Sequence, residues 1–161
     1  MKRKTSAGFT LLELLVVLAV MSVLLTLATL QFNRYSRKSS IEAQVKKLHA
    51  DLQAARSRAL FEKRDKAVAF SASGFAVYSS GSATGAPVDR KPLQYRLVLR
   101  ADPFVVVFNG AGVSSTEGDA VCTEPADNEA ALDALLITPT RIDMGKRNAA
   151  APCSAENITI R

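Results

Sequence analysis

The sequence predicts an α+β fold in which one long N-terminal helix packs on antiparallel β-sheets. Three observations lead to this prediction. Residues 9–30 are almost entirely apolar, residues 9–73 contain neither glycine nor proline, and the chain after residue 64 consists of short β-rich runs. A segment without helix breakers permits one continuous helix. A long helix followed by a series of strands is typical of an α+β protein.

Residues 9–30 form an apolar segment that is long enough to span a membrane. As a helix the segment would rise roughly 33 Å, whereas the hydrocarbon core of a bilayer is about 30 Å thick. A conventional cleaved signal peptide has an apolar region of only about 7–15 residues and an Ala-x-Ala-like site, which residues 26–31 do not offer. Glu13 is the one ionisable residue of the segment. We therefore expect a single membrane-spanning helix.

The helix is predicted to continue beyond the membrane and to end near Lys63. In this second half, apolar residues recur at alternating spacings of four and three, which places them on one helical face. The stripe is too short for a coiled coil, so we expect it to pack on the protein's own sheets. Its members are Ile41, Val45, Leu48, Leu52, Ala55 and Ala59.

After Arg64 the pattern changes to β-rich runs that alternate with turn-rich pieces, such as residues 80–87 and 110–112. At 161 residues, the chain leaves room for one soluble domain beyond the apolar segment. The predicted strands are Lys66–Ala72, Phe75–Ser79, Leu93–Leu99, Phe104–Asn109, Leu135–Thr138, Arg141–Met144 and Ile158–Arg161.

The two cysteines, Cys122 and Cys153, indicate the compartment of this domain. A pair in the C-terminal third fits one disulfide in an oxidising environment better than a metal site, which usually needs three or four ligands. The charges beside the apolar segment do not decide its orientation, because residues 2–4 are basic and residues 34–38 include three basic side chains. The predicted disulfide places the domain outside the cytoplasm.

The net charge of +6 is not the signature of a nucleic-acid-binding protein. Residues 1–8 carry three basic residues and no acidic one, so the remainder has 18 basic and 15 acidic residues, a net charge of +3. Two basic clusters could contact DNA phosphates, but without interleaved aromatic residues we expect a solvated helix end instead. The clusters are Arg56, Arg58, Lys63, Arg64 and Lys66, and Arg141, Lys146, Arg147 and Arg161.

The sequence contains no constellation that predicts a catalytic, metal or cofactor site. His49, the single histidine, falls within the predicted helix and is expected to be a partly buried or surface residue. Gly110 and Gly112 begin like a dinucleotide fingerprint, but Ser115 stands where the third glycine is required, so we interpret the segment as a turn. The protein is therefore expected not to be an enzyme.

Residues 117–133 are rich in carboxylates and contain no basic residue. Such oxygens could hold calcium, but a calcium site needs about six to eight converging oxygens, and no EF-hand spacing is present. We expect a solvated acidic loop. Asn157 opens a glycosylation sequon, a short pattern that arises easily by chance. The acidic residues are Glu117, Asp119, Glu124, Asp127, Glu129 and Asp133.

Residues 8–13, Gly-Phe-Thr-Leu-Leu-Glu, follow a basic leader and open the apolar span, and this arrangement resembles the signature of type IV prepilins and type II secretion pseudopilins. The resemblance implies that a prepilin peptidase on the cytoplasmic face cleaves after Gly8 and that Phe9 becomes the methylated N-terminal residue. A residue without a Cβ leaves room beside the bond that is cut. The resemblance also implies an assembly role for Glu13, whose carboxylate would meet the N-terminal amine of a neighbouring subunit.

Two further segments, residues 48–60 and the Phe108-Asn109-Gly110 turn, resemble the GspH/FimT branch of this family. This branch implies a minor pseudopilin that helps to build a type II secretion pseudopilus and so aids protein export across the outer membrane. The alternative is a FimT-like minor pilin that acts in type IV pilus assembly or DNA uptake. A membrane-anchored periplasmic enzyme is the alternative from another class, although no catalytic cluster supports it. Many pilins carry glycine and proline where this chain has Ser22 and Leu30.

We accordingly expect four segments along the chain. They are a prepilin leader (1–8), the transmembrane half of the helix (9–30), its amphipathic half (31–64) and a β-rich periplasmic domain (65–161). The implied fold is pilin-like, and the chain would cross the bacterial inner membrane once. The expected partners are the prepilin peptidase, other pilins or pseudopilins and the inner membrane. No cofactor is expected.

Overall fold

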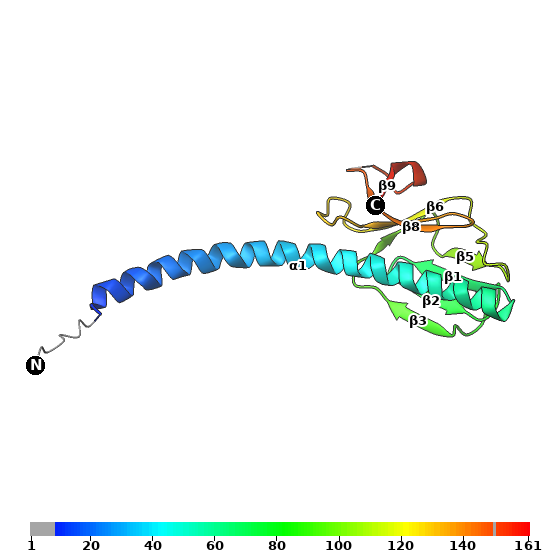
Figure 1. The fold of residues 1–161 in the computed structure, drawn as a ribbon, viewed down its shortest axis with the longest axis horizontal. Helices are drawn as coiled ribbons and strands as arrows, with labels where there is room; N and C mark the ends of the chain where they lie inside the picture. Colours follow the sequence, from blue (N-terminus) through cyan, green and yellow to red (C-terminus); the bar gives the residue numbers. More distant parts are fainter. Residues whose placement is uncertain (1–8, 150) are drawn as a thin grey trace, which may run out of the picture. The chain divides into compact units, whose positions relative to one another are not determined.

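The computed structural model describes residues 9–149 and 151–161. These residues form the long helix α1 (Leu11–Glu62), followed by strands and the short 3-10 helix η1 (Ala155–Asn157) (Figure 1). The contacts divide the chain after Arg37 into two compact units, 1–37 and 38–161. The strands are β1 (Lys66–Ser71), β2 (Gly74–Tyr78), β3 (Asp89–Pro92), β4 (Leu97–Val98), β5 (Phe104–Phe108), β6 (Asp119–Thr123), β7 (Ala134–Ile137), β8 (Ile142–Arg147) and β9 (Ile158–Ile160).

The first unit contains the N-terminal part of α1. Thr10 caps the helix, because its side-chain oxygen Oγ1 accepts a hydrogen bond from the backbone N–H of Glu13 at 3.2 Å. The large apolar side chains described between Leu11 and Leu25 are all exposed. By length and composition α1 contains a segment that could cross a membrane, with a mean hydropathy of 2.7 and none of its window buried in the protein.

The second unit is built on two antiparallel sheets, which confirms the predicted α+β class. The first sheet has the strand order β3-β2-β1-β5, and the second has the order β4-β6-β7-β8-β9. The apolar stripe of α1 packs with side chains of both sheets in one hydrophobic core. Each of the six predicted stripe residues is at most 2% exposed: Ile41, Val45, Leu48, Leu52, Ala55 and Ala59.

Helix α1 ends where a non-glycine residue takes up a left-handed conformation. Lys63 has φ 53°, and the N–H of Arg64 donates to the carbonyl oxygen of Ala59 at 3.3 Å, a bond that closes the last turn as in a Schellman motif. Gly110 approaches this end so closely that a Cβ would lie 3.0 Å from the Lys63 carbonyl carbon. The N–H of Gly110 donates to Asp65 Oδ1 at 3.1 Å. The helix end and this turn are therefore packed together.

Two polar contacts attach the loop around β3 to α1. The amide of Gln44 donates to the carbonyl oxygen of Tyr95 at 2.8 Å and accepts from the N–H of the same residue at 2.9 Å. Lys91 donates to Asp51 Oδ1 at 2.6 Å and lies 5.8 Å from the centroid of the Phe75 ring. Because Gln44 satisfies both backbone groups of Tyr95, this loop needs no strand partner there.

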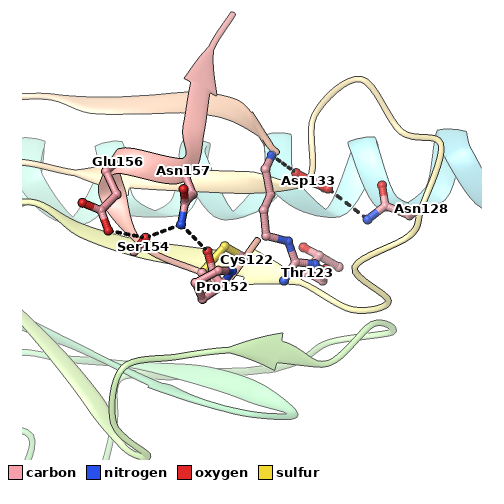
Figure 2. Close-up of a disulfide and its surroundings, with 10 residues drawn as sticks. Cys122, Thr123, Asn128, Asp133, Pro152, Ser154, Glu156 and Asn157 are labelled. Carbon is pink, nitrogen blue, oxygen red and sulfur yellow. Dashed lines mark hydrogen bonds between the residues drawn. A yellow bond between two sulfur atoms is a disulfide. The ribbon is translucent and has the colours of Figure 1, made fainter. Parts of the chain in front are cut away.

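A disulfide between Cys122 and Cys153, with a Cα–Cα distance of 5.9 Å, holds the C-terminal segment to β6. Cys122 lies in a small buried cluster with Ala120, Ala134 and Ile158. Figure 2 shows Pro152, Ser154 and Asn157 beside this bond. Gly145 permits the close approach of β9, since a Cβ there would lie 2.5 Å from a methyl carbon of Ile158. The segment after β8 is thus folded back on the second sheet.

The four edge strands are each protected from further pairing. At the edges of the second sheet, β4 has two residues and β9 has three. β3 ends in Pro92, which has no N–H, and its other residues are charged. β5 is covered by the segment around Ser115, whose N–H donates to the Val107 carbonyl oxygen at 2.8 Å. Short, charged and covered edges resist edge-to-edge association.

The strand predictions were wrong at three places. Leu93–Leu99 forms a strand only at Leu97–Val98, because the Gln44 side chain takes the backbone bonds of Tyr95. β3 was missed because its sequence, Asp-Arg-Lys-Pro, has no apolar alternation. β6 lies within the expected solvated acidic loop, yet its residues Ala120–Thr123 are buried. The acidic segment is therefore partly core.

Removing the disulfide should destabilise the second unit markedly. The bond closes a loop of 31 residues, and in the chain-entropy model such a loop contributes about 3 to 4 kcal/mol. We expect the double variant Cys122→Ala/Cys153→Ala to lose about that much free energy of unfolding in urea. A loss below about 1 kcal/mol would contradict this account. Mass mapping without reduction should also recover the two cysteines in one linked peptide pair.

The Asp51–Lys91 contact should weaken at alkaline pH. The hydrogen bond from Lys91 to the Asp51 carboxylate raises the pKa of the ammonium above its ordinary value. The contact therefore stabilises the fold fully below the pKa of an unfolded lysine, about 10.4, and the contribution is lost as the pH rises through the higher pKa of the folded state. We expect the Tm of the wild type to fall more steeply above about pH 10 than that of Lys91→Met, whereas parallel curves would refute the role of the contact.

Candidate functional site

The candidate site is the N-terminal end of α1 together with the faces of the helix that its own domain leaves uncovered. Gly8, the expected last residue of the leader, lies outside the described residues, so cleavage after it and methylation of Phe9 stay predictions. Phe9 itself is 77% exposed. Nothing in the described part of the chain covers the position at which cleavage is expected.

Glu13 lies in the first turn of α1 and is exposed. Its N–H is held by Thr10, and a carboxylate in this turn is favoured by the partial positive charge at the N-terminus of a helix. Its carboxylate makes no hydrogen bond or ion pair within the described residues. Glu13 is therefore available to a partner outside the chain, and its assembly role remains a prediction.

Three hydroxyl side chains lie three and four residues apart in the apolar half of α1. Ser22 donates to the carbonyl oxygen of Ala19, Thr26 to that of Ser22 and Thr29 to that of Thr26, each at 2.8 Å. These bonds satisfy the hydroxyl groups inside the helix, so that the segment exposes small side chains without unpaired donors. The helix is continuous through Ser22 and Leu30, where many members of the resembled family carry glycine and proline.

The outward face of α1 in the second unit is basic and carries small side chains. All three carboxylates of this stretch are engaged by the domain: Glu42 accepts from the N–H of Ala131, Asp51 from Lys91 and Glu62 from Lys66. The hydrogen bond from Lys66 lowers the pKa of the Glu62 carboxyl below its ordinary value. The exposed residues of this face include Ala43, Lys46, Lys47, Ala50, Ala54, Ser57 and Arg58.

The acidic segment 117–133 does not form a metal site in the described structure. No group of three or more potential ligands comes together among the described residues. Instead, the Lys146 ammonium donates to the carbonyl oxygen of Asn128 at 2.8 Å, to its Oδ1 at 3.0 Å and to Asp133 Oδ2 at 2.8 Å. Asp133 is fully buried, and its Oδ1 accepts from the N–H of Arg147 at 2.7 Å. The chain thus supplies its own cation to this loop.

In the structure, only some residues of the two expected basic clusters are exposed. Lys66 and Arg147 are 7% and 4% exposed, so these two are buried, and Lys146 is half-buried and engaged by the acidic loop. Arg58, Lys63 and Arg64 are exposed at the end of α1.

The same end of α1 carries an aromatic residue that the sequence reading overlooked. Phe61 is 89% exposed and lies three residues from both Arg58 and Arg64. The expectation that no aromatic residue accompanies the basic cluster was therefore wrong. Phe61 stands between Arg58 and Lys63 in the sequence and off the predicted apolar stripe, so the sequence itself contained this signal.

Two further sequence features have structural roles. His49 is half-buried, and its ring Nε2 lies 3.0 Å from the carbonyl oxygen of Ile142, to which it donates. Asn157 of the sequon directs its side-chain amide to the Pro152 carbonyl oxygen at 3.2 Å and to Ser154 Oγ at 2.8 Å (Figure 2). Both side chains are thus used to attach one part of the domain to another.

Comparisons with known proteins find a motif at the start of α1 and a similar fold in the described domain. Residues 3–29 match the family model described as the prokaryotic N-terminal methylation motif. No curated protein matches the sequence. Crystal structures of the type IV minor pilin FimU from Pseudomonas aeruginosa are similar in fold. The first has a TM-score of 0.54 and 16% identity over 68% of this chain and 91% of that one. The second has a TM-score of 0.50 and 17% identity over 64% and 90%.

The motif and the fold coincide in one molecule. The matched residues 3–29 include Phe9, Thr10 and Glu13, and α1 continues from them into a domain with antiparallel sheets. The chain therefore has a pilin-like fold and carries the prokaryotic N-terminal methylation motif at the start of its long helix.

Proposed function

We propose that this protein is a minor pilin-type subunit that is processed at Gly8–Phe9, anchored by α1 and built into a filament of the bacterial cell envelope. The observation that carries the proposal is the start of α1. A methylation motif, a capped helix end and one unpartnered carboxylate lie at the head of an exposed apolar helix. A bare apolar helix needs a bilayer or other helices around it.

The uncovered faces of α1 support assembly through helices. In the apolar half, the hydroxyl groups of Ser22, Thr26 and Thr29 are bonded internally, and small side chains let helices approach closely in a membrane. In the second unit, Ala50 and Ala54 are exposed although the opposite face is buried in the core. A helix that served only to complete its own domain would need neither the exposed apolar half nor the exposed face with Ala50 and Ala54.

Two filament systems fit this role. The sequence resemblance to the GspH/FimT branch favours a type II secretion pseudopilus, where the subunit would aid protein export across the outer membrane. The matched crystal structures are described as a type IV minor pilin, which supports assembly of a type IV pilus as the alternative. Deleting the gene and measuring exoprotein release and surface pili in parallel separates the two systems. A periplasmic enzyme would instead retain its function when cleavage is blocked by Gly8→Val.

Replacing Glu13 should block incorporation into the filament without blocking insertion or processing. A carboxylate that pairs with the N-terminal amine of a neighbour in an apolar bundle fixes the axial register, since separating the two charges there is costly. We expect Glu13→Val and Glu13→Gln to reach the membrane, and to be cleaved so that intact-mass spectrometry finds methylated Phe9. We also expect filament incorporation to fall roughly tenfold or more, the effect of losing about 1.4 kcal/mol or more per contact.

The matched control for this experiment is Thr10→Val. It removes the hydroxyl that caps α1 but leaves the carboxylate of Glu13 in place. If Thr10→Val assembles normally while Glu13→Val does not, the carboxylate itself is required. Normal incorporation and normal secretion or piliation with Glu13→Val would show that Glu13 has no assembly role.

The end of α1 supports DNA contact as a second candidate function. Phe61 is 89% exposed between Arg58 and Arg64, and neither arginine forms a close ion pair among the described residues, although Glu62 lies near enough to interact with both charges. An exposed ring beside cations is the arrangement that binds single-stranded nucleic acid through stacking and phosphate contacts. A subunit of a DNA-uptake pilus would use such a surface.

If DNA binds there, Phe61→Ala should weaken the binding of single-stranded DNA by about 1 to 3 kcal/mol. The binding of duplex DNA should weaken much less, because its bases are already stacked. Arg58→Ala/Arg64→Ala should make the binding of both kinds of DNA less dependent on salt. The slope of log K against log salt concentration should fall by roughly one unit for each phosphate contact that is lost. The measurement is fluorescence anisotropy with the mature chain in detergent micelles. Lys46→Ala/Lys47→Ala is the control with the same change of charge. An equal loss in this control would mean that only net charge matters.

A further inference from the structure

Four exposed side chains surround α1 directly beyond its apolar segment: Phe32, Arg34, Tyr35 and Arg37. We call them the collar. Phe32 and Tyr35 are 68% and 70% exposed, and both arginines are exposed. Within the described residues, neither guanidinium forms an ion pair or a side-chain hydrogen bond. The collar is therefore a cationic and aromatic surface that the protein itself does not use.

The collar has two opposite faces. Residues three apart are neighbours on a helix, so Phe32 and Tyr35 share one face. Two residues turn a helix by about 200°, which puts Arg34 and Arg37 on the other side. A membrane interface surrounds a single helix completely, so it would contact both faces at once. Aromatic rings and snorkelling arginines are the side chains enriched at that depth.

The distance from Glu13 to the collar matches the thickness of a bilayer. From Glu13 to Arg34 the helix rises about 31 Å, close to the hydrocarbon thickness of about 30 Å. Between them the sequence has no other ionisable residue. When the Glu13 carboxylate lies at one interface, the Arg34 guanidinium therefore lies at the other. Neither charge has to enter the apolar region.

We propose that the collar is a docking surface for the headgroups of anionic phospholipids, at the membrane interface opposite Glu13. Each guanidinium offers a planar set of donors that matches a phosphate group, and no carboxylate of the described chain competes for either one. The aromatic face fixes the depth of the helix. The inference rests on the membrane-anchoring part of the proposed function.

Removal of the leader would leave the collar as the first basic group for contact with the membrane. Residues 2–4 carry three basic side chains, whereas residues 9–33 contain no lysine or arginine. After cleavage at Gly8, the collar is thus the first basic group along the chain. Its contact with headgroups would hold the mature subunit in the membrane until a filament takes it up. Membrane retention would then depend on the interface opposite the cleaved end.

The experiment measures lipid preference in the full mature chain. The protein is purified in detergent, mixed with phosphatidylglycerol and phosphatidylcholine in equal amounts, and the bound lipids are counted by native mass spectrometry. We expect the wild type to prefer phosphatidylglycerol and Arg34→Gln/Arg37→Gln to lose that preference by roughly thirty-fold, since each arginine near an anionic surface contributes about 1 kcal/mol. Lys46→Gln/Lys47→Gln, the matched control on the same helix, should keep the preference.

Three outcomes would overturn the collar as a lipid-docking surface. One is an unchanged preference in Arg34→Gln/Arg37→Gln, and another is an equal loss in the Lys46→Gln/Lys47→Gln control. The third is displacement of phosphatidylglycerol by inorganic phosphate, which would indicate a site for the free anion. Carbonate washing of membranes separates failure of the inference from failure of the proposed function. Release of the wild type would contradict anchoring, whereas an integral wild type without lipid preference contradicts the collar alone.

Discussion

Burial of one face of α1 is the interaction on which the rest of the structure depends. Val45, Leu48 and Leu52 are at most 2% exposed, and they belong to one core with side chains of both sheets. Burying each such side chain contributes about 1.5 to 3 kcal/mol. Neither sheet is large, with four and five strands, so the helix supplies the surface that joins them into one core. Within the second unit, this buried face determines which side chains of α1 remain exposed.

The fold could be predicted because its main signals are periodic. The stripe from Ile41 to Ala59 and the continuous apolar run of β5, Phe-Val-Val-Val-Phe, depend only on neighbouring residues. β3 could not be predicted because its four residues are charged or proline and it forms only by pairing with β2. β6 was hidden by the carboxylates around it, although Asp119 lies at its edge and Val121 in the core.

The candidate site shows the same division between local and distant signals. The residues from Phe9 to Glu13 are recognisable because their meaning lies in their order along the chain. Phe61 was overlooked although it lies two residues from Ala59 and therefore off the buried stripe, so that its exposure follows from the helical period. The contact of Lys146 with Asn128 could not be predicted, because its ammonium donates to two oxygens of a residue 18 positions away in the sequence. An acidic segment was visible, but the distant cation that neutralises it was not.

The protection of the sheet edges limits how copies of such a domain can associate. β4 and β9 are too short to serve as templates, Pro92 and charges block β3, and the segment at Ser115 covers β5. These edges disfavour association of copies through continuous hydrogen-bonded sheets, which once formed are very hard to separate. Contacts through helices and loops can be made and broken one subunit at a time. In the proposed filament, a subunit could therefore be added or removed without any domain having to unfold.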